Sequence, residues 1–142
     1  MSDVCTDGCD YGPLAGLIGE WKGEKGIDVA PDGTVYVADT DNDRIVKFNG
    51  SGAYVSEWVT FRNGADVFRS PSDVAVYDSG TILVADTNTN RIVGFDTNGA
   101  YLGEGGNEGT GPIEFKNPTG LAVGPDKGIF ISDTDNDRIQ KA

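Results

Sequence analysis

The 142-residue sequence has no histidine, one methionine and no apolar run close to the ~20 residues of a membrane-spanning helix. Histidine is the commonest general base near neutral pH and the commonest metal ligand. Its absence argues against zinc enzymes and histidine-dependent triads. No serine or threonine stands with a recognisable base, and no G-x-x-x-x-G-K phosphate loop occurs. The sequence therefore predicts a protein that is not an enzyme.

Positive charge is also scarce. Eleven Lys and Arg residues stand against 23 Asp and Glu, and the net charge is -12. Such a chain repels phosphate backbones, which argues against a nucleic-acid partner. The lack of an apolar span argues against a membrane. The charge favours cations or a basic peptide or protein as partners.

The N-terminus lacks the basic and apolar regions of a signal peptide, so we predict a cytoplasmic protein with a flexible tail over residues 1–15. Cys5 and Cys9 in this tail are then expected to be reduced. Two cysteines supply only half of the about four ligands that a structural zinc site needs. We therefore expect no cofactor there.

What is abundant is repetition. Thr34–Phe48 (TVYVADTDNDRIVKF) recurs as Thr81–Phe95 and as Gly128–Ala142, at a constant spacing of 47 residues. Short alternating apolar segments between Gly, Asn and Asp turns predict strands. The first two units contain four such strands and the third contains three, and the units start near residues 26, 72 and 119. Repeats of this period are typical of solenoids, propellers and arrays.

Four-stranded antiparallel meanders repeated every 40 to 50 residues are the blades of a β-propeller. The predicted fold is therefore all-β, with three propeller blades over residues 16–142. Three blades are too few to close a ring, and open faces would expose apolar surface. Residues 17–22 (LIGEWK) align with the fourth strands of the first two units, whereas the third unit has none. We expect a two-fold homodimer in which Leu17, Ile18 and Trp21 complete the last blade of the partner.

The segments Ala38–Ile45 (ADTDNDRI) and Ser132–Ile139 (SDTDNDRI) resemble the NHL-repeat family of propellers, over about residues 16–142. The second unit departs from the pattern at Thr89, where the other units have asparagine. The resemblance implies six blades around a central channel, of which this chain encodes three. It also implies an alternative function, a calcium-dependent enzyme similar to a lyase or a hydrolase.

A shorter stretch, Gly19–Gly23 (GEWKG), resembles the opening of nitrobindin-type haem-binding β-barrels over about twenty residues. Those barrels hold haem iron through a histidine. This chain has none, so no haem is expected.

The D-T-D-N-D loops can be interpreted in two ways. Asp39, Asp41 and Asp43 form the front half of a calcium loop, but the Gly and Glu of an EF-hand are absent from its later positions. Alternatively, the first aspartate accepts hydrogen bonds across the loop, and the arginine that follows pairs with carboxylates between blades. The positions with this structural role are Asp39, Arg44, Asp86, Arg91, Asp133 and Arg138.

In a meander, the loops between second and third strands lie on the same rim as the links between blades. We expect this rim to be acidic. The acidic side chains could bind a cation or a basic peptide, or they could serve only to keep the protein soluble. We therefore predict a non-catalytic binding or scaffold module, or a self-assembling half-propeller. The candidate binding residues are Asp41, Asp43, Asn88, Asn90, Asp135 and Asp137.

Overall fold

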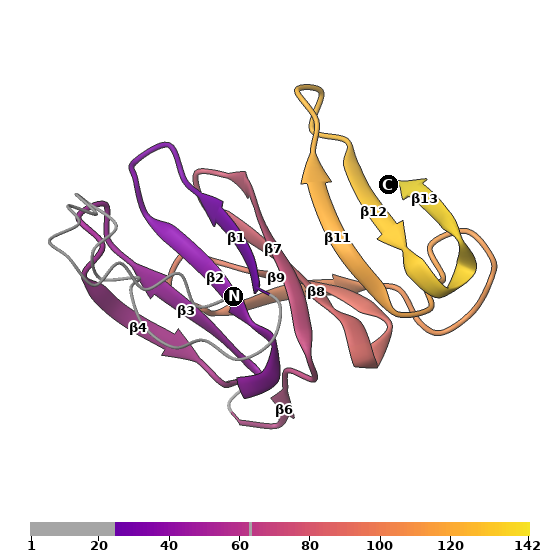
Figure 1. Cartoon of the computed structure of the whole chain (residues 1–142), viewed down its shortest axis with the longest axis horizontal. Coiled ribbons are helices and arrows are strands. Elements are labelled where there is room, and N and C mark those ends of the chain that lie inside the picture. The colour runs from indigo at the N-terminus through magenta and orange to yellow at the C-terminus, as the bar shows by residue number, and fades with distance from the viewer. Residues whose placement is uncertain (1–24, 63) are drawn as a thin grey trace, which may run out of the picture.

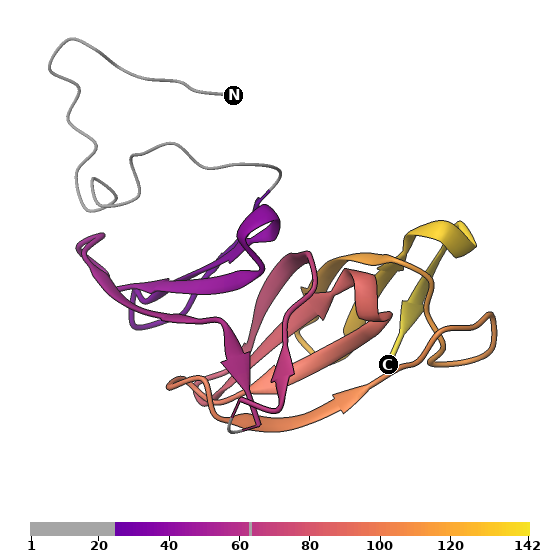
Figure 2. The same cartoon turned by 90° about the horizontal axis from the view of Figure 1, so that it is seen from below.

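The computed structural model describes residues 25–62 and 64–142, in which the regular structure is almost entirely antiparallel β-sheet. Three main sheets, which we call the first, second and third blades, follow one another in chain order (Figures 1 and 2). The first blade contains β1 (Lys25–Val29), β2 (Val35–Asp39), β3 (Arg44–Phe48) and β4 (Tyr54–Trp58). The second contains β7 (Pro71–Asp78), β8 (Thr81–Asp86), β9 (Arg91–Phe95) and β10 (Tyr101–Gly105). The third contains β11 (Pro118–Val123), β12 (Ile129–Asp133) and β13 (Arg138–Lys141).

The predicted all-β fold of propeller blades is confirmed, because each blade is a meander in which sequential strands pair antiparallel. The third blade has three strands among the described residues. Its predicted fourth strand, with Leu17, Ile18 and Trp21, lies outside those residues, as do Cys5 and Cys9.

The hairpin between the third and fourth strands is closed by a side chain. Asn49 Oδ1 accepts hydrogen bonds from the N–H groups of Ser51 and Ala53, both at 3.0 Å. Asp96 repeats this arrangement in the second blade. Asn and Asp favour such turns because their short side chains reach the backbone two residues on.

The link between the first and second blades contains a hairpin that the sequence analysis treats as a plain connection. Its strands are β5 (Thr60–Phe61) and β6 (Asp66–Val67). Each blade also has one 3-10 turn after its second strand. These turns are η2 (Thr40–Asn42), η3 (Thr87–Thr89) and η4 (Thr134–Asn136). Within residues 25–62 and 64–142, no helix is long or apolar enough to cross a membrane.

Apolar side chains gather between neighbouring blades. Between the first and second, Trp58, Phe61, Phe68 and Phe95 form an aromatic cluster, with the ring centroids of Phe61 and Phe68 5.0 Å apart. Aromatic pairs at such distances stabilise a core beyond the area they bury. The cluster between the second and third blades is smaller and mostly aliphatic. It contains Leu83, Ala85, Ile92, Phe115 and Ile131.

The first strands of the blades are joined through side chains, and β7 lies between β1 and β11. Asp28 Oδ2 accepts the N–H of Val76, and Asp73 Oδ2 accepts the N–H of Leu121, both at 2.8 Å. Burial raises the pKa of Asp73. The strands approach so closely that a Cβ at Gly26 would overlap Asp73 Cα. Glycine is therefore required where β1 meets β7.

We expect Gly26→Ala to lower the free energy of unfolding by about 2 kcal/mol, because the new methyl group overlaps the β7 backbone. Gly103→Ala is the control, since its Cβ would meet no atom within 4 Å. It should change stability by less than about 0.5 kcal/mol. Urea denaturation measures both, and equal midpoints would contradict the close approach.

Candidate functional site

The loop between the second and third strands has the same conformation in all three blades. A 3-10 turn is followed by a residue in the left-handed region, with φ of 51° at Asp43, 56° at Asn90 and 51° at Asp137. Asp and Asn tolerate this conformation better than other side chains. The repeated D-T-x-N/T-D/N motif therefore specifies the conformation of this turn.

At the start of each turn lies an aspartate that is 0% exposed. Its Oδ2 atom accepts a hydrogen bond from Nε of the arginine five residues later. A buried carboxylate needs such a partner, because its desolvation is otherwise very costly. The pairs are Asp39–Arg44 (2.7 Å), Asp86–Arg91 (3.0 Å) and Asp133–Arg138 (2.7 Å).

A side chain of the turn donates to the same oxygen. Asn42 Nδ2 lies 2.9 Å from Asp39 Oδ2, and Asn136 takes the same place in the third blade. In the second blade Thr89 Oγ1 donates to Asp86 Oδ2 at 2.7 Å. The departure of the second unit from the repeat therefore preserves the hydrogen bond.

The other oxygen of the buried aspartate holds the segment that enters the blade. Asp86 Oδ1 accepts the N–H of Arg69, and Asp133 Oδ1 accepts the N–H of Lys116, both at 2.7 Å. These donors lie two residues before β7 and β11. One carboxylate thus ties together the second strand, the third strand and the entry to the first strand.

The left-handed residue that ends each turn contacts the next blade. Asp43 Oδ1 accepts the N–H of Ser70 at 2.6 Å, and Asn90 Oδ1 accepts the N–H of Asn117 at 2.8 Å. Both donors have a positive φ, 52° and 50°. Two of the predicted binding residues therefore hold blades together.

The loops predicted to share a rim with the links between blades do meet those links. Asn88 N donates to Arg69 O at 3.1 Å, and Asp135 N donates to Lys116 O at 3.0 Å. The Asn88 side chain also donates to Ser70 Oγ at 3.1 Å. Exposed on this rim are Asp41, Asp43, Asp135 and Asp137.

The three carboxylates of the calcium interpretation do not converge. The Asp39 carboxylate accepts hydrogen bonds from Arg44 and Asn42, and that of Asp43 accepts the N–H of the next link. Asp41 is exposed. Within the described part of the chain, no three Asp, Glu, Cys or His side chains are grouped so as to hold a metal ion.

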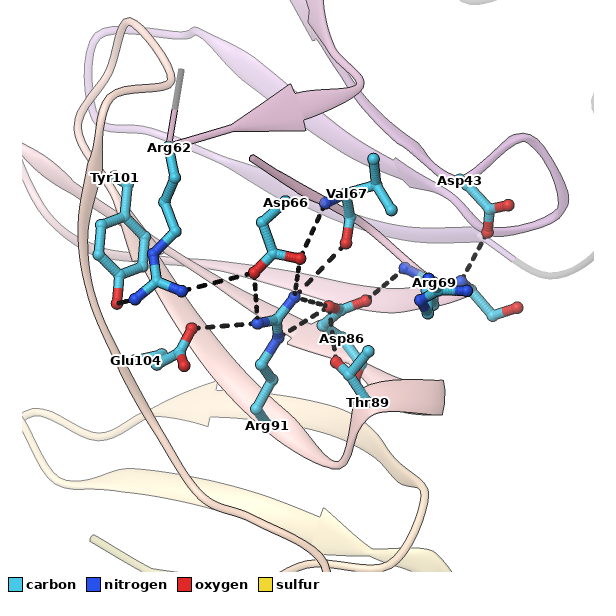
Figure 3. Close-up of polar contacts among 11 residues, drawn as sticks. Asp43, Arg62, Asp66, Val67, Arg69, Asp86, Thr89, Arg91, Tyr101 and Glu104 are labelled. Atoms are coloured by element: carbon cyan, nitrogen blue, oxygen red, sulfur yellow. Dashed lines mark hydrogen bonds and ion pairs between the residues drawn. The ribbon is translucent and has the colours of Figure 1, made fainter. Parts of the chain in front are cut away.

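Arg91 is the centre of a network of polar contacts in the second blade and the link before it (Figure 3). Its Nη1 atom lies 2.8 Å from Asp66 Oδ2 and 3.1 Å from Glu104 Oε2. Its Nη2 atom lies 2.9 Å from Asp86 Oδ2, and its guanidinium carbon lies 5.2 Å from the Phe61 ring centroid. Because Asp66 belongs to β6, the network joins the link hairpin to the second blade.

Hydrogen bonds and burial shift the pKa values of several of these charged side chains. The hydrogen bond from Arg91 lowers the pKa of Asp66. Burial alone would lower the pKa of Arg91, but the bonds to Asp66 and Asp86 raise it above its ordinary value. Burial would raise the pKa of Asp133, but hydrogen bonds, the largest from Asn136, outweigh it and lower that pKa. The folded protein therefore stabilises the ionised forms of Asp66 and Asp133.

The acidic partners of these arginines are not among the residues predicted from the sequence. Glu57, 2.6 Å from Arg44, and Glu104 are 47 residues apart, and this spacing could have identified them. Asp66 lies in a link that the repeat does not conserve, so no sequence signal marks it.

A family model for the NHL repeat matches residues 25–48, 68–95 and 115–142, more than half of the chain. No curated protein sequence matches significantly.

Several solved structures share the fold. Catalytically inactive H270A virginiamycin B lyase from Staphylococcus aureus, solved with quinupristin, has a TM-score of 0.62, 20% identity, and coverage of 84% of this chain and 37% of that chain. Regucalcin, a calcium-binding protein from Agrobacterium tumefaciens, has a TM-score of 0.55 and 20% identity, and the match covers 76% of this chain and 37% of that chain. Myxococcus xanthus glutaminyl cyclase has a TM-score of 0.58 and 17% identity, and the match covers 86% of this chain and 56% of that chain. The chain thus matches about half or less of each, and at these identities the likeness establishes the fold alone.

We expect Arg91→Ala to lower the free energy of unfolding by about 3 kcal/mol, because it leaves the buried Asp86 carboxylate short of its charged partner. Arg62→Ala is the control, since its pair with Asp66 is long (3.6 Å) and exposed. It should cost less than about 1 kcal/mol. Similar losses in urea denaturation would contradict the central role of Arg91.

Stability should also fall as the pH drops below about 4. A carboxyl with a lowered folded pKa stabilises the fold above its unfolded pKa, and this contribution is lost as pH falls through the folded pKa. Asp133→Asn should therefore be destabilised at pH 7 and approach the wild type near pH 3. Asp41→Asn, at an exposed position, should follow the wild type throughout. Urea midpoints from pH 3 to 7 measure this, and a constant difference for Asp133→Asn would refute it.

Proposed function

Because the chain belongs to the NHL repeat family, we propose that it is a non-catalytic, self-assembling half-propeller, two copies of which close one ring of six blades. The described residues contain three blades, whereas propellers typically have four to eight. A second copy supplies the missing blades. The chain then acts as a scaffold through its own assembly.

The observation that carries the proposal is the open face of the third blade, formed by Phe130 and Ile139. These side chains are 38% and 66% exposed. At the same repeat positions, Tyr36 and Ile45 in the first blade are buried against the second blade. The equivalent residues of the second blade, Leu83 and Ile92, are also buried. Where a next blade exists, it covers this face, so a further NHL blade is the occupant that fits.

The first blade has apolar residues at the positions that receive a preceding blade at the internal interface. Val35, Val37, Val46 and Phe48 form a cluster of their own, apart from the two clusters between blades. Their equivalents in the second blade pack against the first blade. Those equivalents are Ile82, Val84, Val93 and Phe95. In the single chain the four side chains of the first blade are at most 5% exposed, so the open face of the third blade carries the proposal.

Polar groups of the third blade fit the same arrangement. Asp43 and Asn90 each accept an N–H group from the link that enters the next blade. Asp137 occupies the same repeat position, and among the described residues its side chain accepts no such bond. In the ring, this carboxylate would take an N–H group from the partner.

The edge of β13 gives the second copy a further contact. Among the described residues β13 pairs only with β12, whereas β3 and β9 each pair with a fourth strand. Residues 17–22 have the sequence pattern of those fourth strands. We assign this segment of the second copy to the free edge, so that backbone hydrogen bonds complete the blade.

The non-catalytic part of the proposal rests on composition and on the arrangement of charges. The sequence has no histidine. The buried carboxylate of each turn is held by an arginine, and those of the second and third turns also accept a backbone N–H, which suits them to stabilising blades.

Light scattering after size-exclusion chromatography tests the assembly. The wild type should have a mass near twice 14.9 kDa. Ile139→Asp should weaken the dimer about 100-fold, because the interface would bury an unpaired carboxylate. Its β-sheet circular dichroism should be unchanged, since Ile139 is exposed in the single chain.

Val55→Asp is the matched control. Val55 is 48% exposed, and its equivalent Leu102 stays 57% exposed although the second blade already has a preceding neighbour. This variant should remain a dimer. A monomeric wild type, or an Ile139→Asp protein as dimeric as the control, would refute the proposed ring.

A further inference from the structure

A cavity of about 300 Å³ lies between the second and third blades. Its walls are almost entirely apolar, and the charged side chain along it, Glu104, is paired with Arg91 at 3.1 Å. An occupant would therefore meet mainly apolar side chains. The wall residues that matter here are Leu83, Ile92, Gly105, Phe115, Ile131 and Ala142.

The equivalent space between the first and second blades is filled by two aromatic side chains. Trp58 and Phe95 are buried there, with ring centroids 5.7 Å apart. The Trp58 ring also lies 5.8 Å from that of Tyr36. This interface has the close packing expected of a protein core.

The repeat shows why the second interface is hollow. At a spacing of 47 residues, Gly105 takes the place of Trp58 and Ala142 takes the place of Phe95. Gly105 pairs with Ile92 as Trp58 pairs with Ile45, which confirms the equivalence in the structure. A Cβ built on Gly105 meets no atom within 4 Å. The cavity thus lies where the first interface places an indole ring and a phenyl ring.

We propose that this cavity binds a small, neutral, planar aromatic molecule of one or two fused rings, of the indole class. The Phe115 ring and the aliphatic side chains of Leu83, Ile92 and Ile131 offer the dispersion contacts that such a ring needs. The buried Nε1 of Trp58 has no hydrogen-bond partner, so apolar contact alone holds an indole ring in the equivalent place. Apolar cavities lined by Leu, Ile and Phe side chains are known to take up small aromatic molecules.

The inference does not depend on the ring of six blades. Every wall residue comes from the second blade, the third blade or the link between them in one chain. A protein that proves monomeric could still bind the ligand, and a dimer could still leave the cavity empty. The two proposals therefore fail independently.

Titration of the full-length protein with indole, followed by amide NMR shifts, tests the site. We expect saturable shifts around Ile92 and Phe115 that fit one site. Gly105→Trp places an indole ring on the chain itself, so it should weaken indole binding at least tenfold. It should also raise the melting temperature by roughly 4 °C, because it fills the cavity.

Ala53→Trp is the control, because it adds a tryptophan at an exposed turn. It should bind indole as the wild type does. Ala142→Phe supplies the other missing ring and should also weaken binding, which keeps the test valid if Gly105→Trp does not fold. Absence of saturable shifts in the wild type, or undiminished binding in a folded cavity-filling variant, would overturn the proposal.

Discussion

The blades depend on one interaction, the ionised aspartate that is buried at the end of each second strand. An isolated charge in this position would be too costly to keep, so the chain surrounds it with donors. Arginine Nε and a turn side chain take one oxygen, and in the second and third blades a backbone N–H of the entering segment takes the other. Because the donors come from three segments, satisfying the carboxylate fixes where those segments lie.

This constraint changes how the acidic rim should be understood. A row of Asp and Asn side chains suggests a surface waiting for a cation or a basic partner. In the structure, Asp43 and Asn90 instead accept backbone N–H groups of the following link. Such bonds act like helix caps, since they satisfy donors at strained positions with positive φ. The rim is therefore first a set of connectors between blades, and exposed side chains such as Asp41 are available for contacts outward.

The two interfaces between blades show that the same frame tolerates different cores. Five aromatic side chains fill the first, whereas glycine and alanine leave the second partly open. The polar connections are alike in both interfaces, because an aspartate in the first strand of one blade accepts a backbone N–H of the next blade in each. Directional hydrogen bonds thus set the position of each blade relative to the next, and side-chain packing adds to the stability of the interface. A repeat protein can in this way vary one interface without losing its architecture.

Local sequence specifies the strands of the blades, their order and the number of blades, because the alternation of apolar residues and the turn chemistry are local and are repeated three times. It also marked the aspartate and arginine positions through their constant spacing. The pairing of Arg91 with Asp66 and the hairpin in the first link depend on the tertiary structure. It alone decided that Gly105 and Ala142 border one cavity. The link hairpin lies outside the repeat, and the other features join residues far apart in the sequence. Their partners therefore depend on proximity in the fold, which a local pattern does not encode.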